Sequence, residues 1–179
     1  MSDLPELLKI LPIDQIATQL GISKEEAAAA AEEGGEAILA GLELNASTPQ
    51  GAESLESALK EHELTDDQLS IESIDVEDGD KILGHVFDGK EDQVVAGLAG
   101  TAGGSGINFA KLLPMIAPAV MAMLARKSAA STRSTSTKSS GLDLGSIIGG
   151  MLGGGKSSGK GGGLDLGGLL GSILGGGRK

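Results

Sequence analysis

The chain has 179 residues, of which 30 are glycine, 2 are phenylalanine and none is cysteine, tryptophan or tyrosine. Because there is no cysteine, disulfides, thiolate catalysis and cysteine-ligated metal centres are excluded. The net charge of −11 is divided unevenly, since residues 1–125 hold 23 acidic and 6 basic side chains and residues 126–179 hold 2 and 8. An acidic body repels phosphate and aromatic platforms for bases are missing, so we expect no nucleic-acid partner.

The first 20 residues predict two short helices or one kinked helix. Leucine and isoleucine recur at helical spacing from Leu4 to Leu20. Pro12 interrupts this pattern because proline lacks the N–H that a helix interior needs. Gly21 stands at the position of a helix C′ residue, where glycine is favoured.

Residues 23–44 predict two further helices. Ser23 and Glu26 form the capping-box pattern S-x-x-E, which opens an alanine-rich helix from residue 24 to about residue 33. The glycine pair 34–35 is expected to stop or bend this helix. The next helix should then run from residue 36 to about residue 44.

Helix-capping patterns also occur in the middle of the acidic region. Thr48 followed by Pro49 is typical of an N-cap and a first helical residue, and it predicts a helix to about Glu63. The side chains expected to be buried there are Leu55, Ala58 and Leu59. A T-x-x-Q pattern at residues 65–68 predicts another short helix. From residue 69 to 80 the apolar residues follow no single period, so helix and loop both stay open.

Helical spacing returns in the last third of the body. Residues 80–89 predict a helix with four apolar side chains on one face: Ile82, Leu83, Val86 and Phe87. Residues 91–98 predict the next helix, followed by a glycine-rich loop at 100–106. The final helix should run from residue 108 to about Arg126, kinked at Pro114 or Pro118. Its apolar part, 112–125, is short for a bilayer span, which favours a buried helix.

Three phrases in this region carry a family resemblance. They are DGDKILGHVF at residues 78–87, VVAGLAGTAG at residues 94–103 and KLLPMIAP at residues 111–118. Together they resemble the YidB-like family of uncharacterised bacterial proteins over roughly residues 4–125. The resemblance implies a small multihelical domain, often followed by a Gly/Leu-rich tail, with no established activity and no functional residues to carry over.

The C-terminal region contains a duplication. Residues 141–156 (GLDLGSIIGGMLGGGK) and 163–178 (GLDLGGLLGSILGGGR) are identical at ten of sixteen positions and differ elsewhere only by conservative exchanges. We name them the first and second tail copies. In each, the apolar residues fall at i, i+3, i+4, i+7 and i+8, one stripe of a helix, with glycine and serine opposite. The predicted docking residues are Leu144, Ile147, Ile148, Met151 and Leu152 in the first copy, and Leu166, Leu169, Leu170, Ile173 and Leu174 in the second.

The energy of one tail copy indicates that it needs a surface to fold against. Burying five aliphatic side chains is worth roughly 1.5–3 kcal/mol apiece. Ordering about ten residues costs about 1–2 kcal/mol each, so the two contributions nearly cancel. Each copy should therefore be disordered alone, bind weakly, and gain strength from being present twice.

Several weak motifs favour structural interpretations. Residues 150–157 fit the spacing of a phosphate-binding loop but lack its preceding strand. Residues 16–27 have the rhythm of a helix-turn-helix, yet the second helix is acidic. The acidic run at 72–80 places apolar residues where a calcium loop needs oxygen ligands. No set of nucleophile, base and orienting residue can be assigned around His62 or His85. We therefore expect no enzyme activity, no cofactor and no bound metal.

The sequence thus predicts an all-α protein: a small multihelical bundle with a disordered Gly/Leu-rich C-terminal tail. Its parts are an acidic helical domain (1–126), a Ser/Thr linker (127–140) and the duplicated tail (141–179). The early acidic residues do not resemble a secretory signal, so we expect cytoplasmic residence. The first hypothesis is a non-enzymatic adaptor or assembly protein whose tail docks on a protein partner or sister subunit. The alternative is a peripheral membrane-surface binder that uses the basic, striped tail.

Overall fold

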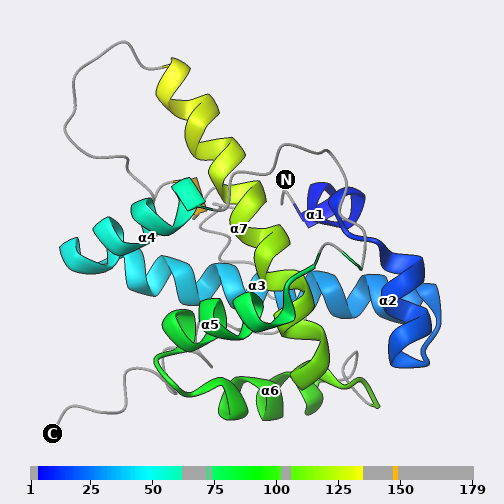
Figure 1. Ribbon diagram of the computed structural model, residues 1–179. Coiled ribbons are helices and arrows are strands. Elements are labelled where there is room, and N and C mark those ends of the chain that lie inside the picture. The colour runs from blue at the N-terminus through cyan, green and yellow to red at the C-terminus, as the bar shows by residue number, and fades with distance from the viewer. Residues whose placement is uncertain (1–3, 62–71, 73, 102–105, 135–146, 149–179) are drawn as a thin grey trace, which may run out of the picture.

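A computed structural model describes residues 4–61, 72, 74–101, 106–134 and 147–148. Within those residues the chain forms helices and no strand (Figure 1). The helices are α1 (Leu4–Ile10), α2 (Ile13–Leu20), α3 (Lys24–Ala46), α4 (Pro49–Glu61), α5 (Val76–Phe87), α6 (Glu91–Ala99) and α7 (Phe109–Ser134). The all-α fold class predicted from the sequence is confirmed.

Helix α7 is the central element of the bundle. It packs against each of the six other helices, most extensively against α5 and α3. From Leu112 to Ala125 every residue except Pro118 is buried. The segment Phe109–Ala130 is long and apolar enough to cross a membrane by length and composition alone, but 78% of its most apolar window is buried inside the protein. The prediction of a buried domain helix is therefore confirmed for this segment.

The local signals of the N-terminal half produce the predicted helix ends. Pro12 separates α1 from α2, and Gly21 closes α2 in the left-handed conformation with φ 71°. At the start of α3 the Ser23 side chain accepts a hydrogen bond from the Glu26 N–H, while the Glu26 carboxylate accepts one from the Ser23 N–H. Both predicted boundaries are confirmed.

Helix α3 shows that the predicted break at the glycine pair was wrong. The helix is continuous from Lys24 to Ala46, and Gly34 and Gly35 are both buried within it. A Cβ atom added to Gly34 would lie 2.8 Å from Ile116 Cδ1 of α7. Glycine is used here so that two helices can approach closely, and the packing energy gained outweighs the helix propensity that glycine loses.

Helix α4 begins as predicted, with the Thr48 hydroxyl accepting a hydrogen bond from the Gly51 N–H at 3.1 Å. Leu55 and Leu59 are buried and Ala58 is partly buried, as the pattern predicted. The T-x-x-Q pattern at residues 65–68 lies outside the described residues.

Helices α5 and α7 are longer than predicted. α5 begins at Val76 because the Asp75 side chain accepts a hydrogen bond from the Asp78 N–H, so the acidic run forms a first helical turn. Val76 is 43% exposed, which explains why this turn has no apolar face to detect. α7 continues to Ser134, past the end predicted at Arg126, and the Lys127 side chain lies 3.6 Å from the Glu6 carboxylate of α1.

Candidate functional site

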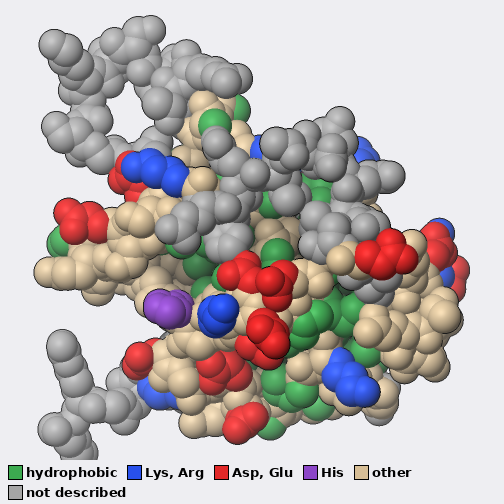
Figure 2. Space-filling model, viewed as in Figure 1, with side chains coloured by type: hydrophobic (Ala, Val, Ile, Leu, Met, Phe, Trp, Pro, Cys, Tyr) green, Lys and Arg blue, Asp and Glu red, His purple; other side chains and the backbone are tan. Residues whose placement is uncertain are grey.

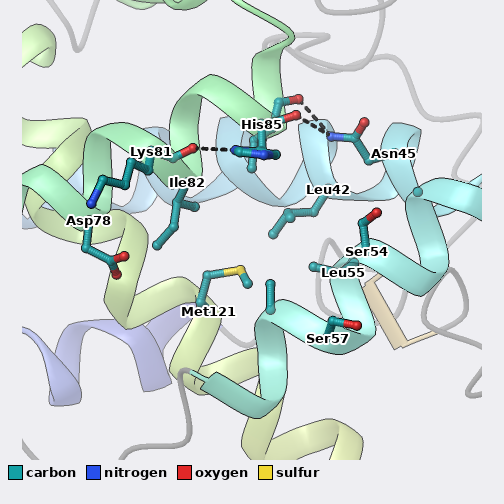
Figure 3. Close-up of a pocket in the computed structure, with 13 residues that line it drawn as sticks. Leu42, Asn45, Ser54, Leu55, Ser57, Asp78, Lys81, Ile82, His85 and Met121 are labelled. Atoms are coloured by element: carbon teal, nitrogen blue, oxygen red, sulfur yellow. Dashed lines mark hydrogen bonds between the residues drawn. The ribbon is translucent and has the colours of Figure 1, made fainter.

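A hollow lined by described residues lies between α4 and α5. This groove has a volume of about 640 Å³. Its floor is apolar and comes from four helices: Leu42 of α3, Leu55 and Ala58 of α4, Ile82 and Val86 of α5, and Met121 of α7. In Figure 3 the Leu42, Ile82 and Met121 side chains converge on the space between α4 and α5. We call this feature the α4–α5 groove.

Polar side chains form the rim of the groove. They are Asn45 of α3, Ser54 and Ser57 of α4, and Asp78, Lys81 and His85 of α5. On α5 the lining residues follow the spacing i, i+3, i+4 and i+7, so one edge of this helix supplies a charged rim and an apolar floor together. An apolar floor with a polar rim is suited to an amphipathic helix.

The α5 edge of the groove is held by hydrogen bonds to backbone carbonyls. Asn45 Nδ2 donates to the carbonyl oxygens of His85 at 3.2 Å and Val86 at 3.0 Å, near the C-terminus of α5 (Figure 3). These carbonyls lie in the last turn, where the helix offers no further N–H donors. His85 Nδ1 lies 2.9 Å from the Lys81 carbonyl oxygen, which can only accept, so this nitrogen carries the proton. Thus Asn45 fixes α3 to α5, while His85 is tied to its own helix.

The α4 edge is positioned by the tight connection from α3. A Cβ atom added to Gly51 would collide with the Asn45 carbonyl oxygen, so the first turn of α4 lies directly against the end of α3. Within α4 the Ser57 hydroxyl donates to the Glu53 carbonyl at 3.1 Å. The close approach at Gly51 therefore sets where Leu55 lies relative to the groove.

The surface beside the groove is acidic. Figure 2 shows Asp and Glu side chains gathered on the face that α5 and α6 form. The described charges there include Glu77, Asp80, Glu91 and Asp92, which are all at least partly exposed. A basic segment would be attracted to this face over distances up to about 10 Å at moderate salt.

Two of the ten predicted docking residues lie within the described structure. Ile147 and Ile148 are helical; Ile148 is fully buried in the hydrophobic core cluster, and Ile147 packs partly buried against that cluster. Figures 1 and 3 both place this short segment beside α4. The other eight, Leu144, Met151, Leu152, Leu166, Leu169, Leu170, Ile173 and Leu174, lie outside the described residues. A piece of the first tail copy is thus covered by the chain's own domain.

The groove itself was not predicted from the sequence. No role is predicted from the sequence for Asn45, which follows the helix end expected near residue 44, and His85 is assigned no catalytic role. The spacing of Asp78, Lys81, Ile82 and His85 was the available signal, but it identifies one edge of a helix and not the helix opposite it. No group of three or more His, Asp or Glu positioned to hold a metal ion occurs within the described part of the chain.

Comparison with known proteins gives one result. A family model described as "Bacterial protein of unknown function (DUF937)" matches residues 5–127, which span α1 to the middle of α7. No curated protein and no solved structure matches the chain. The match covers the four helices that form the groove and ends before the tail.

Proposed function

The chain belongs to this family of bacterial proteins of unknown function, and on that premise we propose that it is a non-enzymatic adaptor or assembly protein. In this proposal the acidic helical domain is the scaffold, and the duplicated tail docks on a protein partner or on a sister subunit. The observation that carries the proposal is the complete burial of Ile148, which belongs to one of two near-identical aliphatic stripes.

The burial of Ile148 supports the proposal because it pairs this stripe with a helical surface. A segment of glycine and aliphatic residues gains little from folding alone, since ordering its backbone costs about as much as burying its side chains returns. The helices of the domain are already ordered, so docking has to order only the stripe, and the entropy cost of forming the contact is lower. Because Ile148 is buried in the core cluster, the equivalent side chain of the second copy, Leu170, is expected to need an apolar surface as well.

Charge supports the same arrangement. The body carries 23 acidic and 6 basic residues before position 126, while the remainder carries 2 acidic and 8 basic residues. Opposite charges on the two parts raise the rate at which a tail finds an acidic domain, its own or another molecule's.

Removal of the second tail copy tests the proposal. We expect a chain ending at Ser157, which keeps Ile148, to lose association with sister subunits or partners that the full chain shows in native mass measurement and in pull-down from lysate. A full-length chain with Ser158, Gly159 and Gly161 changed to alanine controls for altered spacer composition. Equal native mass and equal recovery of partners by the full and shortened chains would contradict the proposal.

Liposome flotation separates this proposal from a membrane-surface role. Lys156, Lys160, Arg178 and Lys179 flank the two stripes and could contact anionic lipid. If the adaptor role is correct, the full chain will stay with the soluble fraction in the presence of vesicles that contain phosphatidylserine at low salt. Co-flotation that is lost on removal of residues 158–179 would favour the membrane-surface role instead.

A further inference from the structure

We propose that the α4–α5 groove is the docking site of the second tail copy, residues 163–178, of the same chain. The first tail copy, through Ile148, is then a fixed part of the domain core. This inference rests on the proposed function and deepens it, because it assigns different roles to the two copies and gives the second one a defined receptor.

The surface that covers Ile148 of the first copy is already filled. Ile148 has no exposed surface within a single chain, and it belongs to the same core cluster as Leu55 and Leu59 of α4. The second copy carries Leu170 at the equivalent position, 22 residues later. Because the first copy occupies its surface beside α4, the second copy needs a different one.

The α4–α5 groove has the shape and chemistry for such a stripe. Its floor contains only apolar side chains, contributed by Leu42, Leu55, Ala58, Ile82, Val86 and Met121. Its volume of about 640 Å³ falls in the range of pockets that hold sizeable ligands. The exchange of Ile for Leu between the two copies conserves volume, and such exchanges are well tolerated in apolar sites.

The connection between the two copies is long enough for this docking. From the dimensions of glycine-rich linkers, the spacer at residues 153–163 is expected to span roughly 17–20 Å on average. Helix α4 has 13 residues and is therefore about 20 Å long. The described segment 147–148 and the groove both lie beside α4 (Figures 1 and 3), so a spacer of this length is sufficient for the second copy to reach the groove.

Effective concentration favours the chain's own groove over that of another molecule. A single copy is expected to bind weakly, because burial and ordering nearly cancel. A short glycine-rich spacer is expected to hold the second copy at an effective concentration of about millimolar, far above the concentration of a second molecule in dilute solution. The segment therefore occupies its own groove first, and a partner of the adaptor has to compete with that contact.

Methionine methyl NMR on the full chain tests this proposal. Met121, Met115 and Met123 are all buried on α7, but only Met121 lines the groove, so the other two report on correct folding. We expect the double substitution L169D/L170D to shift the Met121 methyl signal and to leave those of Met115 and Met123 in place. Ser172→Asp, which adds a charge on the face opposite the stripe, should leave all three signals unchanged.

A spin label gives a second, independent readout. Because the chain has no cysteine, Ser172→Cys allows a nitroxide to be attached at one position of the second copy. We expect this label to broaden the Met121 methyl signal at every protein concentration, and L169D/L170D to remove that broadening.

Three results would overturn the inference. They are an unchanged Met121 signal in L169D/L170D, an absence of broadening by the label, and broadening that appears only as protein concentration and native mass rise together. The last result would place the second copy in another molecule's groove and leave the proposed assembly role intact. Loss of partner capture without any change at Met121 would likewise separate the two proposals.

Discussion

At the scale of single residues, Glu36 shows how a helix can carry an unfavourable charge. It lies on α3 close in sequence to Glu32 and Glu33, and it is partly buried. Burial raises the pKa of the Glu36 carboxyl above its ordinary value of 4.5, and the charges of Glu32 and Glu33 raise it further. Glu33 Oε1 is itself buried without a hydrogen-bond partner among the described atoms. The ionised form of Glu36 therefore opposes folding.

The pH dependence of folding should reveal this charge. Because the folded protein binds the Glu36 proton more tightly than the unfolded chain does, the destabilisation is present at neutral pH and disappears as the pH falls through the raised pKa towards 4.5. We expect Glu36→Gln to raise the free energy of unfolding at pH 7.5 and to have little effect near pH 4.

Urea titrations at both pH values provide the measurement. Glu43→Gln is the matched control, since it removes one carboxylate from an exposed position of the same helix. A stabilisation by Glu36→Gln that persists unchanged at pH 4, or one that Glu43→Gln reproduces in full, would show that the cause is not the burial of Glu36.

At the scale of elements, the extensive contact between α5 and α7 includes a close backbone approach at one glycine. A Cβ atom added to Gly79 would collide with the backbone carbonyl of Pro114. That carbonyl would normally accept a hydrogen bond from the residue four positions later, which is Pro118 and has no N–H. The two prolines of α7 and the glycine of α5 therefore form one packing arrangement, in which the α5 backbone fits against the region where α7 lacks a hydrogen bond.

Gly79→Ala should accordingly destabilise the protein. Neither partner of the contact is a flexible side chain, so the helices have to separate, and we expect a loss of at least about 1–3 kcal/mol. Gly84→Ala on the same helix is the control, because its Cβ would lie 3.4 Å from the end of the Glu91 side chain, which can move. Alanine there should be neutral or stabilising by up to about 1 kcal/mol.

Thermal unfolding of the two variants measures this difference in stability. Equal melting temperatures for Gly79→Ala and Gly84→Ala would mean that α5 and α7 do not approach as closely as Gly79 and Pro114 indicate.

At the scale of the whole molecule, the two tail copies should differ in their effect on stability. Ile148 is fully buried in the core cluster, so Ile148→Ala should lower the free energy of unfolding by about 2–5 kcal/mol. Leu170→Ala removes the equivalent side chain from the second copy, which in our proposal docks reversibly in the α4–α5 groove. We expect a much smaller effect from it.

Chemical denaturation of the two single variants and their combination measures this difference. The two effects should add, because in our proposal the two side chains occupy separate sites. Equal destabilisation by both substitutions would mean that the two copies share one role.

The sequence by itself determined the features that depend on a few neighbouring residues. Pro12, Gly21, the Ser23–Glu26 capping box and Thr48–Pro49 fixed helix ends through local hydrogen bonds and backbone angles, and each gave the predicted boundary. The apolar face of α5 and the buried character of α7 also followed from spacing alone.

Only the tertiary structure decided the features that depend on distant parts of the chain. The glycine pair of α3 continues the helix because α7 packs against it, which no local propensity reveals. The α4–α5 groove and the burial of Ile148 likewise need four helices brought together in three dimensions. An apolar stripe in the sequence indicates side chains that gain from burial. Packing between elements decides which surface buries them, because burial is a property of the whole fold.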